Sequence, residues 1–232
     1  MFEERYTSEA HLEYNPEWHT EESPWKVRHI TQLLQANSLN PKTIGEVGCG
    51  FGEVLNLLQK EKNEERECWG YEISSVAFQH AQERAHSRLH FKMADMTKES
   101  EAFFDLLLVL DVVEHVADYL GFLLQIRSKG QYKILQVPLE LSAQTVLRSG
   151  ALLKQRRTMG HLHYFTKETL LHTLEDRGYK ILDYVYTSSS LELPTHLPVT
   201  RLMRGPRRLC SVLNKDLAAR LLGGYRLMVL TR

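Results

Sequence analysis

Four acidic residues stand where the chain leaves predicted strands, and a glycine-rich loop follows the first of them. Glu46 opens the run Glu-Val-Gly-Cys-Gly-Phe-Gly at residues 46–52, and Glu72, Asp95 and Asp111 follow three later apolar segments. The carboxyl ends of parallel strands meet at one edge of an open sheet, where such folds bind their ligands. Glycine lets the backbone approach a ligand closely. The sequence therefore predicts a carboxylate-rich ligand site at that edge.

The elements that must position these residues alternate along the chain. Patterns typical of strands cover residues 42–47, 68–71, 89–93, 104–110, 132–137, 179–187 and 225–231. Patterns that favour helices cover residues 24–37, 53–60, 74–86, 113–126 and 166–177. Strands that alternate with helices predict βαβ units and a mostly parallel α/β sheet with right-handed crossovers. We expect one domain over residues 1–232, with an N-terminal lid segment 1–25 and substrate-side insertions 139–160 and 188–224.

The charges around the glycine loop limit the classes of ligand that could bind there. A dinucleotide site has the pattern G-x-G-x-x-G/A, and Glu72 fits its later ribose-binding acid. Position 53 is Glu rather than Gly or Ala, and a carboxylate there would repel a pyrophosphate at the helix start. A cationic ligand without phosphate fits this edge better. S-adenosylmethionine is such a ligand, because it carries a sulfonium, an ammonium, a ribose diol and an adenine.

The order of motifs resembles that of class I S-adenosylmethionine-dependent methyltransferases, in the branch that acts on small molecules and lipids. The stretches that carry this resemblance are 46–52 (EVGCGFG), 70–74 (GYEIS), 94–96 (ADM), 104–115 (FDLLLVLDVVEH) and 160–166 (GHLHYFT). The resemblance covers residues 24–187 and the last strand. It implies a Rossmann-like seven-stranded sheet of order 3-2-1-4-5-7-6 with helices on both faces and an antiparallel last strand.

The resemblance also implies a set of cofactor contacts and their roles. The implied contacts are Glu46, Gly48, Cys49, Gly50, Glu72, Ile73, Asp95, Met96, Leu110 and Asp111. Glu46 would face the positive end of the methionine moiety, Glu72 would accept hydrogen bonds from the ribose diol, and Asp95 would accept one from the adenine amino group. S-adenosyl-L-homocysteine would be the product.

Transfer of a methyl group to oxygen can also need a base. His115, His161 and His163 are the candidate catalytic residues. A packing role for His115 and loop hydrogen bonds for the other two remain open as alternatives. We expect no metal site, because the His-x-His pair has no further clustered ligand that is evident in the sequence.

Two further groups are candidates for binding the acceptor. Trp18, His19 and Trp25 precede or open the first helix, where they could form a lid or instead fix the entry of the helix. Arg156 and Arg157 lie in a basic stretch, as do the arginines of residues 201–208. These stretches could be solvated faces or could bind an anionic acceptor or a membrane surface.

Composition and absent motifs narrow the class of acceptor. The net charge is zero over 232 residues, and the three cysteines contain no CxxC pair. With no signal peptide visible, we expect a cytoplasmic transferase. No Asn/Asp-Pro-Pro-Tyr or Pro-Cys motif follows the fourth strand, so we expect a small-molecule, lipid or glycan-precursor acceptor and no nucleic acid. The alternatives are a catalytically silent methyltransferase-like binding protein and a nicotinamide-dependent oxidoreductase.

Overall fold

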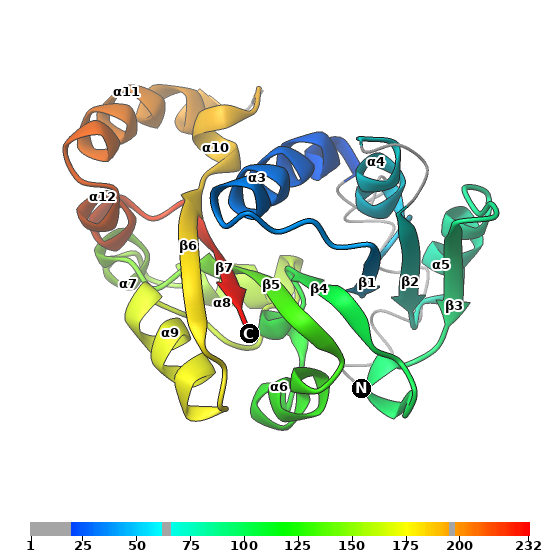
Figure 1. The fold of residues 1–232 in the computed structure, drawn as a ribbon. Coiled ribbons are helices and arrows are strands. Elements are labelled where there is room, and N and C mark those ends of the chain that lie inside the picture. Colours follow the sequence, from blue (N-terminus) through cyan, green and yellow to red (C-terminus); the bar gives the residue numbers. More distant parts are fainter. Residues whose placement is uncertain (1–19, 62–65, 195–197) are drawn as a thin grey trace.

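The computed structural model describes residues 20–61, 66–194 and 198–232, which form a seven-stranded sheet with helices on both faces (Figure 1). The strands are β1 (Thr43–Val47), β2 (Glu67–Glu72), β3 (Leu89–Met93), β4 (Phe104–Leu110), β5 (Gly130–Leu139), β6 (Ile181–Thr187) and β7 (Tyr225–Thr231). Their order is β3-β2-β1-β4-β5-β7-β6, and β7 is antiparallel to both of its neighbours. The expected strand order and antiparallel last strand are confirmed.

Two hydrophobic layers enclose the sheet. The helices are α3 (Ser23–Ala36), α4 (Glu53–Glu61), α5 (Ser75–Gln82), α6 (Tyr119–Arg127), α7 (Ala143–Leu147), α8 (Ala151–Thr158), α9 (Lys167–Asp176), α10 (Ser189–Glu192), α11 (Pro198–Leu213) and α12 (Lys215–Leu222). The short 3-10 turns are η1 (Thr20–Glu22), η2 (Met96–Lys98) and η3 (Val113–His115). Helices α3, α4 and α5 supply one buried cluster, while α6, α9 and α12 supply the other.

The central strand β4 explains why the core forms on both sides. Leu106 and Leu108 point into the cluster with α3 and α4, whereas Leu107 and Val109 point into the cluster with α6 and α9. All four side chains are fully buried. A strand covered on both faces needs a continuous apolar sequence, and residues 104–110 provide one.

Two expected boundaries differ from the structure near the site. The helix expected over residues 113–126 is divided into η3 and α6, because Asp118 caps a new helix by accepting from the Gly121 N–H at 2.9 Å. The expected strand end at Pro138 is also wrong, since β5 continues to Leu139 and pairs with β7 along its length. No helix within the described residues is long and apolar enough to cross a bilayer.

Two features favour glycine at position 52, the third glycine of the loop: a left-handed backbone conformation and a close contact with the Phe91 ring. Gly52 has a φ of 76°, and a Cβ built there would lie 2.4 Å from two ring carbons of Phe91. Gly150 has a nearly equal φ of 75°, but a Cβ there would meet no atom within 4 Å. The two positions therefore share the same backbone strain and differ in the contact.

We expect Gly52→Ala to destabilise the protein by about 1–3 kcal/mol more than Gly150→Ala, because overpacking a core contact adds to the cost of a left-handed residue. Urea unfolding of the two variants measures the difference. Equal losses of stability would show that the Phe91 ring moves away freely.

Candidate functional site

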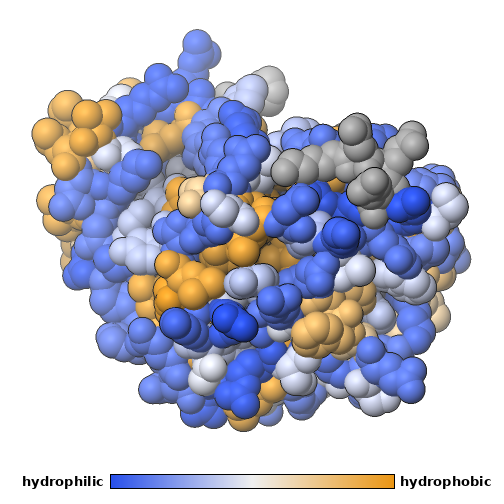
Figure 2. All heavy atoms as spheres, viewed as in Figure 1, coloured by the Kyte–Doolittle hydropathy of each residue, from blue (hydrophilic) through white to orange (hydrophobic). Residues whose placement is uncertain are grey.

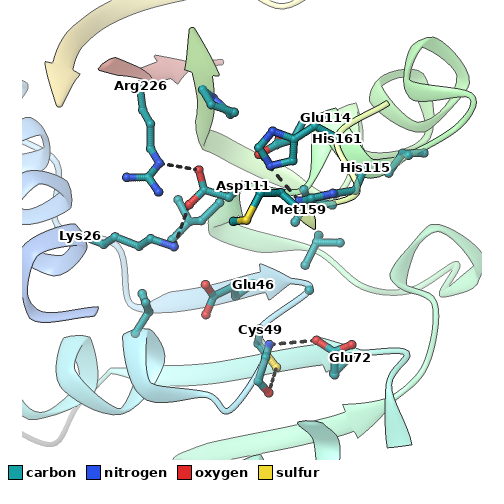
Figure 3. Close-up of a pocket in the computed structure, with 18 of the residues that line it drawn as sticks. Lys26, Glu46, Cys49, Glu72, Asp111, Glu114, His115, Met159, His161 and Arg226 are labelled. Carbon is teal, nitrogen blue, oxygen red and sulfur yellow. Dashed lines mark hydrogen bonds and ion pairs between the residues drawn. The ribbon is translucent and has the colours of Figure 1, made fainter. Parts of the chain in front are cut away.

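A cavity of about 730 Å³ opens at the carboxyl edge of the sheet. Its lining includes the ends of β1, β2, β4 and β5, the start of β7, the turns η2 and η3, and parts of α3, α8 and α10. Figure 3 shows the charged side chains that project into it from these elements. All of the expected cofactor contacts from Glu46 to Asp111 line this cavity, as do His115 and His161.

The glycine loop and Glu72 form one hydrogen-bonded unit. The Gly50 N–H donates to Glu72 Oε2 at 2.9 Å, and the Ile73 and Ser74 N–H groups both donate to Glu72 Oε1 at 2.8 Å. Gly48 and Gly50 have φ values of 65° and 55°. Burial raises the pKa of Glu72, and the three N–H donors oppose that shift. Glu72 therefore fixes the loop as well as facing the cavity.

Glu46 is a buried carboxylate without a complete set of partners. Its residue is 3% exposed, and Oε2 accepts no hydrogen bond. Burial raises the pKa of Glu46 to about 8, the Lys26 ammonium partly opposes the shift, and the Glu72 carboxylate adds to it. A ligand that brings a positive group or N–H donors would satisfy this oxygen.

The negative charge of Asp111 is neutralised by two cationic side chains of the protein. Its φ is 55°, a rare conformation for a residue with a side chain, and it follows directly after β4. Lys26 Nζ lies 2.8 Å from Asp111 Oδ2, and Arg226 Nε lies 3.2 Å from Oδ1 (Figure 3). Arg226 also pairs with Glu22 at 3.0 Å. Helix α3 and strand β7 therefore converge on the end of β4.

The opposite end of the cavity is more apolar. Ile73, which is 47% exposed, and Met96, which is buried, both line it. Asp95 caps η2, because its Oδ1 accepts from the Thr97 N–H at 3.0 Å and from the Thr97 hydroxyl at 2.6 Å. Lys98 Nζ lies 3.3 Å from Asp95 Oδ2. This carboxylate is thus largely engaged within its own turn.

Two of the three candidate histidines come together beside Glu114. The His115 and His161 rings are 4.8 Å apart between centroids and meet edge to face. His161 Nδ1 lies 2.9 Å from Glu140 Oε2, and His115 Nδ1 lies 3.3 Å from the Gly160 carbonyl oxygen. Donor atoms of Glu114, His115 and His161 lie within 4.8 Å of one another. The His-x-His pair itself is divided, because only His161 belongs to this group, and folding brings Glu114 and His115 beside it.

Four other candidates do not line the cavity. His163 Nε2 contacts the Val116 carbonyl oxygen at 2.9 Å outside it. Trp25 is 1% exposed and donates from Nε1 to Glu192 Oε2 at 3.0 Å, so it fastens α3 to α10. Arg156 and Arg157 lie on α8 and are not part of the lining, although their neighbour Gln155 is. Trp18 and His19 lie outside the described residues.

Sequence patterns alone missed several charged residues of the cavity wall, and four of them matter most for the site. They are Lys26, Glu114, Glu140 and Arg226. Glu114 stood within a quoted motif, where its position beside His115 was the available signal. The other three belong to a helix, a post-strand loop and the last strand, and no spacing in the sequence connects them to the glycine loop.

Comparisons with known proteins agree with this geometry. A family profile described as a methyltransferase domain matches residues 18–184. The plantazolicin methyltransferase BpumL, solved with a monoazolic desmethylPZN analog and SAH, has a TM-score of 0.63 and 15% identity, and the alignment covers 94% of this chain and 86% of that one. The N-methyltransferase NodS from Bradyrhizobium japonicum WM9, solved with S-adenosyl-L-homocysteine, has a TM-score of 0.59 and 14% identity, with coverage of 100% and 95%. No curated relative was found by comparison.

A third solved structure, a putative sarcosine dimethylglycine methyltransferase from Galdieria sulphuraria, has a TM-score of 0.62 and 11% identity, with coverage of 91% and 85%. At these identities the likeness shows a shared fold.

The raised pKa of Glu46 predicts how the stability of the ligand-free protein depends on pH. The pKa of the Glu46 carboxyl is about 8 in the folded protein and near 4.5 in the unfolded chain. Between these two pH values the folded protein keeps a proton that the unfolded chain has lost. The free energy of unfolding is therefore highest below pH 4.5 and falls as the pH rises toward 8. The stability of Glu46→Gln minus that of the natural protein should therefore grow between pH 5 and pH 8, by at most about 1.4 kcal/mol per unit.

Urea unfolding across this pH range measures the effect. Glu67→Gln is the control, because that side chain is 49% exposed at the amino-terminal end of the neighbouring strand β2. A difference for Glu46→Gln that stays constant from pH 5 to pH 8 would contradict the assigned burial of an uncompensated carboxyl.

Proposed function

The chain belongs to the family of methyltransferase domains, and we propose that it transfers a methyl group from S-adenosylmethionine to an oxygen atom of a small-molecule, lipid or glycan-precursor acceptor. The observation that carries the cofactor assignment is Glu46, a buried carboxylate whose Oε2 lacks a donor within a cavity at the strand ends. The solved structures of NodS and BpumL that share the fold contain S-adenosyl-L-homocysteine or SAH.

The cavity walls suggest which residues would hold the cofactor. Glu46 would take the ammonium group, and Lys26 would face the carboxylate of the methionine moiety. Glu72 would accept from the ribose diol, because each of its anchored oxygens still has accepting capacity beyond the backbone bonds. Ile73 and Met96 would pack on the adenine. When bound, the cofactor supplies a methyl carbon that its sulfonium activates toward in-line displacement.

The acceptor end is proposed to lie toward the insertions. Gln155, Thr158 and Met159 of the first insertion and Ser189 and Ser190 of the second line the same cavity. This placement supports the proposed division of the chain into a methyltransferase domain with substrate-side insertions. An acceptor hydroxyl must lose its proton as the new bond to carbon forms, and His115 and His161 are the proposed groups that influence this proton.

Calorimetry with S-adenosylmethionine tests the cofactor assignment, and transfer of a labelled methyl group to candidate acceptors tests the activity. Binding without transfer would favour the catalytically silent alternative. A chain that binds nicotinamide nucleotides and does not bind S-adenosylmethionine would refute the proposal.

We expect Glu72→Ala to weaken S-adenosylmethionine binding by at least about tenfold, because it removes the proposed ribose acceptor and frees the Gly50 N–H that shapes the loop. Calorimetry measures the affinity, and thermal unfolding confirms that the variant is folded. Glu67→Ala, at the far end of the same strand, should leave the affinity unchanged. An unaltered affinity in Glu72→Ala would mean that this acid does not face the ribose.

Helix α11 supports a proposed contact with an anionic membrane surface. Leu202, Leu209 and Leu213 are 79%, 66% and 79% exposed, and their spacing of seven and four places them on one side of the helix. Exposed Arg201 and Arg208 stand one residue before Leu202 and Leu209. Such a helix, apolar on one side and basic beside it, is typical of segments that lie in a lipid interface.

The remaining arginines of α11 hold the helix to the protein. Arg204 Nε donates to the Ser190 carbonyl oxygen at 2.9 Å, and Arg207 donates to the Leu222 carbonyl oxygen at 3.3 Å. Apolar side chains gather on the surface where α11 runs into α12 (Figure 2). Because Ser190 lines the cavity, the proposed membrane surface would lie next to the acceptor end.

We expect the protein to sediment with vesicles that contain phosphatidylglycerol and to remain in solution with pure phosphatidylcholine vesicles. Leu209→Glu should lower the bound fraction several-fold, because it places a charge on the apolar side of α11. Phe103→Glu is the matched control, since Phe103 is 61% exposed directly before β4, at the sheet edge away from the cavity. Equal binding by both variants would place the membrane contact elsewhere.

A further inference from the structure

A compact group of metal-capable side chains lies at the acceptor end of the cavity. One donor atom each from Glu114, His115 and His161 lies within 4.8 Å of the other two. The Glu114 residue is fully buried, and all three residues line the cavity. Figure 3 shows the three side chains lying together, on the opposite side of Asp111 from Lys26.

The backbone holds this group in place. The Leu162 and His163 N–H groups both donate to the Glu114 carbonyl oxygen, at 2.7 and 3.2 Å, so the segment that carries His161 is tied directly to η3. His115 Nδ1 lies 3.3 Å from the Gly160 carbonyl oxygen and donates to it as the protonated nitrogen of the ring. His115 Nε2, the other nitrogen of the ring, lies 4.0 Å from Glu114 Oε1. A ring nitrogen fixed by a backbone carbonyl is a common arrangement for metal-binding histidines.

Several buried polar atoms of this group lack hydrogen bonds. Both carboxylate oxygens of Glu114 have no donor. His161 Nδ1 and Glu140 Oε2 are 2.9 Å apart, yet neither makes a hydrogen bond of acceptable geometry. Lys26 and Arg226, the cationic side chains nearest this end of the wall, both pair with Asp111.

We propose that Glu114, His115 and His161 bind a divalent first-row transition-metal ion, and that this ion also binds an oxygen atom of the methyl acceptor. Opposite ligands of such an ion lie about 4.2 Å apart, so closing the observed group requires shifts of under about one ångström. Two imidazoles with a carboxylate suit ions such as Mn²⁺, Fe²⁺ or Zn²⁺ better than Mg²⁺ or Ca²⁺.

The position of the ion fits a role in binding the acceptor. Three protein ligands leave coordination positions open, as catalytic rather than structural sites do. An acceptor hydroxyl bound there would lose its proton more easily, because the cation would stabilise the oxygen anion, and the proton would pass to solvent water while the methyl group moves from the sulfonium to that oxygen. The role of the ion in transfer rests on the proposed function, whereas its binding does not. Glu140 is a positioning residue in this site, since it lies against His161.

Mn²⁺ binding by the cofactor-free protein tests the proposal. Electron paramagnetic resonance of free Mn²⁺ in a titration should show one saturable site per chain, and Mn²⁺ should raise the thermal unfolding midpoint. Glu114→Gln should weaken binding by at least about tenfold and abolish the rise in the midpoint, because it keeps the side-chain volume and removes the charge. His115→Gln provides a second variant with the same expected loss.

Glu175→Gln is the matched control. Glu175 forms an exposed pair with His172 at 3.1 Å, so a change there should leave Mn²⁺ binding unaltered. The absence of saturable binding, or equal binding by Glu114→Gln and Glu175→Gln, would overturn the metal site. Calorimetry with S-adenosylmethionine in the presence of a chelator separates this result from the proposed function, because cofactor binding does not require the ion.

Discussion

The structure depends on how the protein accommodates buried carboxylates at one edge of its sheet. An ionised carboxylate away from water is costly unless it is paired or hydrogen-bonded. Glu72 meets this requirement with three backbone N–H groups, and Asp111 meets it with Lys26 and Arg226. Glu46 and Glu114 meet it incompletely, since oxygens of both lack donors. The two incompletely satisfied acids mark where positive groups from outside the chain would bind.

The fold creates this edge by placing the loops that follow β1 to β5 at the carboxyl ends of parallel strands. The apolar β4, buried on both faces, fixes the centre of the sheet, and the loop after it carries both Asp111 and Glu114. Hydrogen bonds from residues 162 and 163 to the Glu114 carbonyl oxygen then bring a distant segment against that loop. A well-packed sheet can thus hold a polar cavity open, because its stability comes from the two apolar layers behind it.

The sequence was a good guide to features that follow from local pattern. The alternation of strands with helices and the glycine loop follow from periodicity or a contiguous motif. The strand order and the antiparallel last strand were implied by the resemblance to class I methyltransferases, and the structure contains all of these features. Contacts between distant segments were beyond that reasoning. The proximity of Glu114 to His161 depends on how residues 139–160 return to η3, and Trp25 proved to be a core residue because Glu192, far along the chain, accepts from its indole. The spacing of basic residues in the sequence likewise did not reveal that Arg204 and Arg207 face the protein.

Arg226 shows how segments that are far apart in the sequence form the cavity together. It comes from the last strand, pairs with Asp111 after β4 and with Glu22 before α3, and lies 5.6 Å from the centre of the Trp25 ring. Lys26 approaches the same aspartate from α3, so one carboxylate joins three segments that the sequence separates widely. Because Asp111 also has a φ of 55°, its backbone would relax if these pairs were lost. Helix α3 and strand β7 therefore hold the turn on which the metal-capable residues and the cofactor end of the cavity both depend.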